Sequence, residues 1–193
     1  PPSVYDAVGD ACWQLALELS RENQVTLLVS SSDRLGSAAV TEPVTICTVS
    51  NDWGVRTLKE VTRHVRKLKP DVLLVHFVPQ LYGWNGAKPG LAVLLHILKR
   101  QGCKIITVAH EVSAPFGPSP KLMAWATIHS LLFWIIAAAS RQIVATTAMR
   151  CAMVRRLVSW RRGDCCHIPI GSTIPVVTAE PIQDREELSR EYG

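Results

Sequence analysis

Two stretches decide the fold: DVLLVHF at Asp71–Phe77 and KIITVA at Lys104–Ala109. Each is a nearly continuous apolar run rich in Val, Ile and Leu, as expected of strands buried on both faces of a parallel sheet. Segments of helical period lie before and after them. Because strands and helices alternate along the chain, we predict an α/β domain, a Rossmann-like three-layer fold with a mostly parallel sheet.

The same patterns place the remaining elements. The expected strands are Val25–Ser30, Val44–Thr48, Asp71–Phe77, Lys104–Ala109, Gln142–Thr146 and Cys165–Ile168. The expected helices are Ala7–Arg21, Trp53–Lys67, Gly90–Gln101 (stopped by Gly102), Lys121–Ala139 and Thr147–Val158. In the first helix we expect Ala11, Leu15 and Leu19 to form the inward stripe.

The first helix has no strand before it, which is unusual for this fold. We therefore expect a strand upstream of Pro1, at the centre of the sheet, and a chain that is cut short at both ends. Residues 1–178 are interpreted as one domain, and residues 179–193 as a linker and the start of a further domain.

The chain has 193 residues, 48% of them hydrophobic, and a net charge of +5 that is unevenly distributed. Trp53–Lys69 carries six Lys or Arg against one acid, Arg141–Arg162 carries six Arg and no acid, and Glu180–Gly193 carries five acids. The two basic zones are candidate anion-binding surfaces. Because no nucleic-acid-binding motif accompanies them, nucleic acid is not expected as a partner.

The six cysteines show no Cys-x-x-Cys pair and no zinc-ligand spacing. We expect free thiols in a reducing, cytoplasmic compartment, no metal site and no cofactor. Leu122–Ala139 has no formal charge, but Thr127, His129 and Ser130 lie in it. It therefore indicates a helix buried between layers rather than a membrane span.

Ligands of open parallel sheets bind beyond the carboxyl ends of the strands. His110 and Glu111 stand there, directly after Lys104–Ala109, and a neutral imidazole can donate or accept a hydrogen bond near pH 7. The alternative for His110 is a structural histidine at the strand end. His76, inside an apolar run, is interpreted as a core or edge histidine.

Three further features have a functional and a structural interpretation. Gly9 would let a phosphate or sugar approach a helix N-terminus, or simply permit a tight turn, since neither GxGxxG nor GxxxxGK[ST] is present. Tyr82, Trp84 and Asn85 would stack on and hydrogen-bond a sugar, or form a plain surface loop. The Arg-rich stretch 150–162 would meet an anionic membrane, or be a solvated helix face.

The order of segments resembles the N-terminal domain of family 4 glycosyltransferases, which have the GT-B fold. The HE pair after a strand and the IPIGS-x-IP segment carry most of the resemblance, which covers nearly the whole chain. The segments are VGDACWQLALEL (Val8–Leu19), QVTLLV (Gln24–Val29), KPDVLLVHF (Lys69–Phe77), KIITVAHE (Lys104–Glu111), QIVATT (Gln142–Thr147) and HIPIGSTIPV (His167–Val176).

This resemblance implies a retaining transferase of two Rossmann-like domains, with the nucleotide-sugar donor held mainly by the C-terminal one and a carbohydrate or glycolipid acceptor mainly by this one. The leaving diphosphate helps to deprotonate the acceptor, so this half need not supply a base. By position, Gly9 matches the donor-phosphate loop and His110 the histidine facing the transferred sugar.

We also expect Asp10 and Glu111 to bind the acceptor, together with Tyr82, Trp84 and Asn85. The resemblance places Gly171 and Ser172 just before the interdomain linker. Ala7 and Val8 stand where the family usually has a second glycine.

We expect an enzyme of polysaccharide or glycoconjugate biosynthesis, cytoplasmic or peripheral at the inner membrane, of which this fragment alone is inactive. The alternative is a non-catalytic Rossmann-like ligand-binding module.

Overall fold

The computed structural model describes residues 7–30, 43–49, 55–82, 89–114 and 117–171. Its strands are β1 (Val25–Ser30), β2 (Val44–Val49), β3 (Val72–Phe77), β4 (Lys104–Ala109), β5 (Gln142–Ala145) and β6 (Cys165–His167). Its α-helices are α1 (Ala7–Leu19), α2 (Val55–Leu68), α3 (Gly90–Arg100), α4 (Pro120–Ala139) and α5 (Ala148–Leu157), with 3₁₀ helices η1 (Pro79–Tyr82) and η3 (Ser159–Asp164). Every strand and helix predicted within residues 7–168 is present, and no end is shifted by more than two residues.

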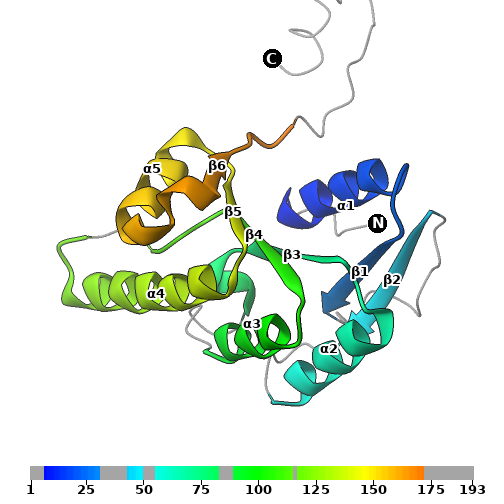
Figure 1. Ribbon diagram of the computed structural model, residues 1–193. Coiled ribbons are helices and arrows are strands. Elements are labelled where there is room, and N and C mark those ends of the chain that lie inside the picture. The colour runs from blue at the N-terminus through cyan, green and yellow to red at the C-terminus, as the bar shows by residue number, and fades with distance from the viewer. Residues whose placement is uncertain (1–6, 31–42, 50–54, 83–88, 115–116, 172–193) are drawn as a thin grey trace, which may run out of the picture.

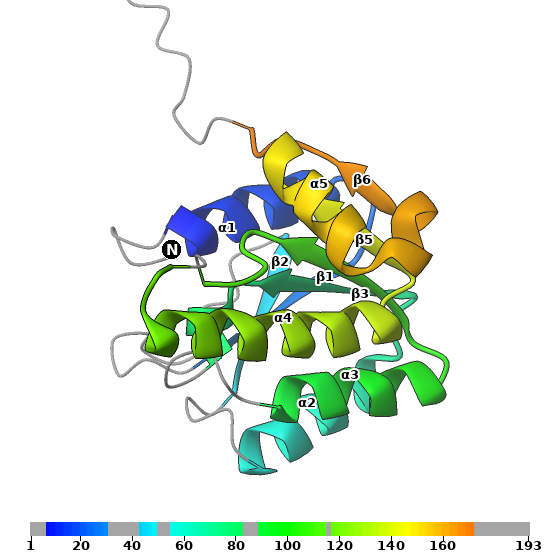
Figure 2. The same ribbon diagram turned by 90° about the vertical axis from the view of Figure 1, so that its left-hand side faces the viewer.

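All paired strands are parallel, and the fold is the predicted Rossmann-like α/β architecture. The strands follow one another from β6 to β2 in Figure 1. Helices α2, α3 and α4 cover one face, and α1 and α5 cover the other (Figure 2). Three layers result because strands with apolar side chains on both faces need helices on both sides.

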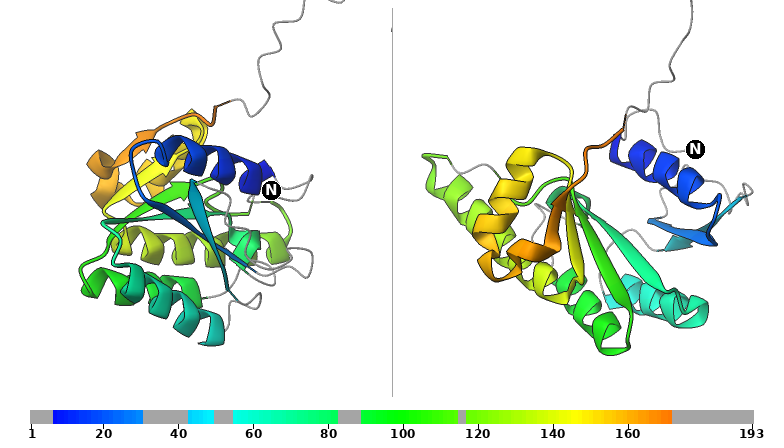
Figure 3. Two further views of the ribbon diagram at one scale, coloured as in Figure 1. Left: turned by 90° about the vertical axis from the view of Figure 1, so that its right-hand side faces the viewer. Right: turned by 45° about the horizontal axis from the view of Figure 1, so that its top comes forward.

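The strands form two sheets, β1-β2 and β3-β4-β5-β6, and within the described residues no strand pairs with both β1 and β3. The pair β1-β2 stands apart from the larger sheet in Figure 3. Among the described residues β3 therefore lies at an edge of its sheet, and the strand expected upstream of Pro1, at the centre of the sheet, stays a prediction. At this open edge Val72 and Leu74 of β3 are exposed, and Val25–Val29 of β1 are only half-buried.

The core lies between the four-stranded sheet and the helices α3 and α4. Leu98 and Phe133 are fully buried there, and the ring centroids of Phe77 and Phe133 are 5.6 Å apart. Burying a side chain of this size contributes about 1.5–3 kcal/mol. Helix α3 ends just before Gly102, the predicted stop, whose φ of 88° suits glycine, and Cys103 N donates to Leu98 O at 3.1 Å.

Two burial predictions are corrected. In α1 the fully buried residue is Ala16, whereas Leu15 of the predicted stripe is exposed. Helix α4 does not lie between layers: it covers one face of the sheet, burying residues such as Phe133 and Ile136 and exposing its opposite side. It is long and apolar enough to cross a membrane by length and composition, and 33% of its apolar window is buried.

Candidate functional site

The site begins with two histidines at the carboxyl ends of β3 and β4. In the parallel register Phe77 lies opposite Ala109, so His110 follows directly beside the end of β3. His110 N donates to Phe77 O at 3.0 Å, which fixes the backbone there. This is the edge at which ligands of parallel α/β sheets bind.

The imidazoles of His76 and His110 form a hydrogen-bonded pair. His76 Nδ1 lies 2.9 Å from His110 Nε2, and the ring centroids are 5.2 Å apart at an interplanar angle of 27°. One of these two nitrogens must carry the hydrogen. If it is His76 Nδ1, neutral His110 carries its own proton on Nδ1 and presents a donor there; if it is His110 Nε2, Nδ1 is an acceptor. His76 therefore sets the tautomer of His110.

Burial and neighbouring positive charge keep both rings neutral. Burial, with a smaller contribution from His110, lowers the pKa of His76 to about 4. Burial likewise lowers the pKa of His110, and the charge of Arg150 adds to this effect. A buried imidazolium loses hydration, and a nearby cation repels it. At pH 7 the pair is thus neutral, as the sequence analysis assumed for His110.

The first turn of α5 supplies the positive charge. Thr147 caps this helix in an extended conformation, and its Oγ1 accepts from Arg150 N at 3.2 Å. The cap holds Arg150 in the first helical turn, where the positive end of the helix dipole adds to the guanidinium charge. The surroundings of His110 therefore favour an anionic group.

Tyr82 is hydrogen-bonded to the strand that carries His76, instead of being a free side chain on a surface loop. Its hydroxyl donates to His76 O, and its ring lies 6.1 Å from that of Phe77. Burial raises the pKa of Tyr82, and the Cys12 thiol of α1 adds to the rise. The hydroxyl predicted to meet a sugar is engaged inside the fold.

The other predicted site residues are distributed as follows. Gly9 and Asp10 lie in the first turn of α1 and are half-buried, three and two residues before Cys12. Glu111 is half-buried beside His110, and its N donates to Phe77 O at 3.4 Å. Gly171 is exposed beyond β6. Trp84, Asn85 and Ser172 lie outside the described residues.

Sequence reasoning missed the parts that His76 and Arg150 play. The signal for His76 was its place near the end of the apolar run that comes before the His110 strand. Arg150 follows the cap residue Thr147 by three positions, the spacing that brings its backbone N–H to the cap. Both signals depend on knowing which strands are neighbours.

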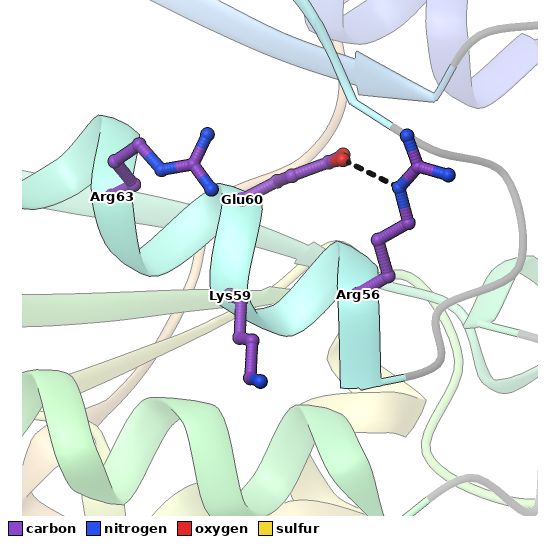
Figure 4. A pocket seen from close by; sticks show the side chains of 4 residues that line it. All are labelled: Arg56, Lys59, Glu60 and Arg63. Atoms are coloured by element: carbon purple, nitrogen blue, oxygen red, sulfur yellow. Dashed lines mark hydrogen bonds and ion pairs between the residues drawn. The ribbon is translucent and has the colours of Figure 1, made fainter.

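A second, basic surface lies on α2. A depression of about 480 Å³ is lined by Arg56, Lys59, Glu60 and Arg63. Arg56 Nε and Glu60 Oε1 form an ion pair at 3.1 Å, and Lys59 points away from this pair (Figure 4). Three cations against one carboxylate leave this surface positive.

In the part of the chain that the structure describes, cysteines and potential metal ligands form no second chemical centre. All six cysteines are free thiols, as predicted, and the sulfur atoms of Cys151 and Cys165 lie 3.5 Å apart in the core. Burial, together with a hydrogen bond to Cys151, raises the pKa of Cys165 to about 12. Over the described ranges, no three His, Cys, Asp or Glu residues gather as metal ligands.

Comparison with known proteins adds no assignment. The chain matches no protein-family model, and no curated protein shows significant similarity to it. The fold and the His76–His110 pair are the features that bear on function.

Proposed function

We propose that this chain is the acceptor-side domain of a retaining glycosyltransferase. It would act on a nucleotide-sugar donor and on a hydroxyl of a carbohydrate or glycolipid acceptor, in polysaccharide or glycoconjugate biosynthesis in the cytoplasm. The observation that supports this best is a neutral His110 at the carboxyl edge of the sheet, oriented by His76 and facing the charge of Arg150.

In this reaction the acceptor-side domain would position the substrates and stabilise developing charge. The bond between the anomeric carbon and the diphosphate breaks, the acceptor oxygen bonds to that carbon on the same face, and its proton passes to the leaving diphosphate. Nδ1 of His110 makes no hydrogen bond within the described part of the chain and suits a sugar hydroxyl. Arg150 and the start of α5 favour the negative charge that develops on the leaving group.

A non-catalytic ligand-binding module is the second candidate. At the start of α1, Ala7 and Val8 carry side chains at positions where glycine would let a phosphate come closer to the backbone. Such a module would bind a nucleotide sugar at the same edge without transferring the sugar.

The test is a His110→Ala substitution in the natural gene product that carries residues 1–193. We expect kcat to fall by about a hundredfold or more, because a positioned hydrogen-bonding group is lost. The assay follows release of nucleoside diphosphate over a panel of nucleotide sugars and acceptors. His64→Ala on α2 is the matched control.

Unchanged turnover with normal thermal stability would contradict the role of His110. Binding of a nucleotide sugar without release of nucleoside diphosphate, across the whole panel, would favour the binding module.

A further inference from the structure

Helix α4 presents a face without charge to solvent. No Asp, Glu, Lys or Arg occurs between Lys121 and Arg141. On the side away from the sheet Leu131 is 60% exposed and Trp134 44%, with Ile128 and Ile135 also exposed. A helix in the outer layer of a domain normally carries polar residues on its outer face. A contiguous exposed apolar patch instead indicates an interaction site.

Aromatic and cationic groups stand at the C-terminal end of this face. The Trp134 and Trp160 rings meet edge to face at 5.8 Å, and the guanidinium of Arg161 lies 5.5 Å from the Trp160 ring. Lys99 Nζ donates to Ala138 O at 2.6 Å. Trp with neighbouring Lys or Arg is the composition found at membrane interfaces, where an apolar body and a polar rim are both satisfied.

The apolar surface continues onto α3 and meets a basic groove. Helices α2, α3 and α4 form one layer (Figures 1 and 2), and Val93 and Ile97 of α3 are exposed on it. Between α2 and α3 runs a groove of about 520 Å³. Its lining combines an apolar floor with cations and includes Leu58, Lys59, Arg63, Arg66, Val93 and Ile97.

Charge selects the kind of partner. Helices α2, α3 and α4 together carry eight Lys or Arg and a single acid, Glu60. A cationic surface around an apolar helix face complements an anionic lipid surface. A protein partner is favoured less, because protein interfaces average about one hydrogen bond per 100–200 Å², and the exposed side of α4 offers few side-chain donors or acceptors.

We propose that the outer face of α2, α3 and α4 docks on an anionic lipid bilayer. The exposed side of α4 would lie in the plane of the membrane, at the boundary of headgroups and acyl chains, with the cations of the α2–α3 groove on lipid phosphates. The helix lies on the bilayer and does not cross it, because Phe133 and Ile136 on its other side are buried against the sheet. This proposal does not depend on the proposed transferase activity.

The test is flotation of the 193-residue chain with vesicles of phosphatidylcholine and phosphatidylglycerol at a ratio of about 7:3, compared with pure phosphatidylcholine. We expect binding to the anionic vesicles that weakens with salt. Leu131→Gln with Ile135→Gln should weaken it by about tenfold or more, because apolar area is removed. Met149→Gln, an exposed apolar position on α5 in the opposite layer, is the control and should bind as wild type does.

The cationic contribution is tested separately. Lys59→Gln with Arg63→Gln should lower affinity several-fold and reduce the salt dependence. Arg21→Gln, just after α1, combined with Arg156→Gln on α5 makes an equal charge change and should have a smaller effect. Thermal unfolding of each variant checks that it is folded.

The depth of α4 in the bilayer is measured with brominated lipids, which quench the fluorescence of tryptophan side chains near the acyl chains. Trp134→Phe should keep vesicle binding and lose part of the quenching. No binding to anionic vesicles, or equal binding by the α4 variant and its Met149 control, would overturn the proposal. Self-association that Leu131→Gln with Ile135→Gln abolishes, without vesicle binding, would assign the face to a protein interface instead.

Discussion

At the residue scale the site depends on one hydrogen bond between two imidazoles. The 2.9 Å contact of His76 Nδ1 with His110 Nε2 survives when both rings are neutral or when only one is protonated, but two imidazolium rings would place N–H against N–H. Both pKa values are lowered in the folded chain. Protonation of either ring should therefore cost stability, and protonation of both should break the pair.

The pH dependence follows with a definite sign. In the unfolded chain both histidines titrate near 6.5, whereas folded His76 titrates near 4. Between these pH values the unfolded chain binds more protons than the folded chain. The free energy of unfolding is therefore highest above about pH 7 and falls as the pH drops toward 4. For His76 the loss is on the order of 2–3 kcal/mol.

Urea unfolding at pH 7.5 and pH 4.5 measures this loss. In His76→Gln, whose amide can still donate to His110, the difference between the two pH values should shrink by most of that amount, while His64→Gln should leave it unchanged. An equal pH dependence in wild type and His76→Gln would contradict the assignment.

At the element scale the start of α5 is held by its cap. Thr147 Oγ1 accepts from Arg150 N, and this contact places Arg150 in the turn whose charge acts on His110. Thr147→Ala should lower the free energy of unfolding by about 1 kcal/mol, because the backbone N–H of Arg150 loses its hydrogen-bond partner. It should also let the pKa of His110 move back toward its ordinary value, since Arg150 is held less firmly.

The two effects of Thr147→Ala are measured by chemical denaturation and by NMR titration of the His110 ring. Thr147→Ser keeps the oxygen and should restore both. A loss of stability in the Ala and Ser variants alike would assign the effect to the methyl group of Thr147 rather than to the cap.

At the scale of the whole molecule, the sequence predicted the elements well because each strand is an apolar run with a clear end. It also predicted His110 as a residue at the strand edge, since that position depends only on where Lys104–Ala109 stops. The His76–His110 contact could not be predicted, because it depends on strand order. The exposure of Val72 and Leu74 also depends on strand order, because their apolar run alone indicates a strand buried on both faces.

Strand order also divides the domain into parts of unequal stability. β4 pairs with β3 and β5 and is buried at Ile105, Val108 and Ala109, whereas β1 pairs with β2 and is only half-buried. A sheet of two strands is marginal unless other elements pack on it. The pair β1-β2 should therefore open without global unfolding, while β4 exchanges its amide hydrogens only when the core unfolds.

Native-state hydrogen exchange tests this division directly. Amides of Ile105–Val108 should exchange about a hundredfold or more slowly than those of Thr26–Val29 under conditions in which opening is reversible and fast. Low concentrations of urea should accelerate β4 exchange, which needs global unfolding, but change β1 exchange little. Equal protection and equal urea dependence of β1 and β4 would mean that both sheets unfold as one cooperative unit, and that the edge between β1 and β3 does not separate them energetically.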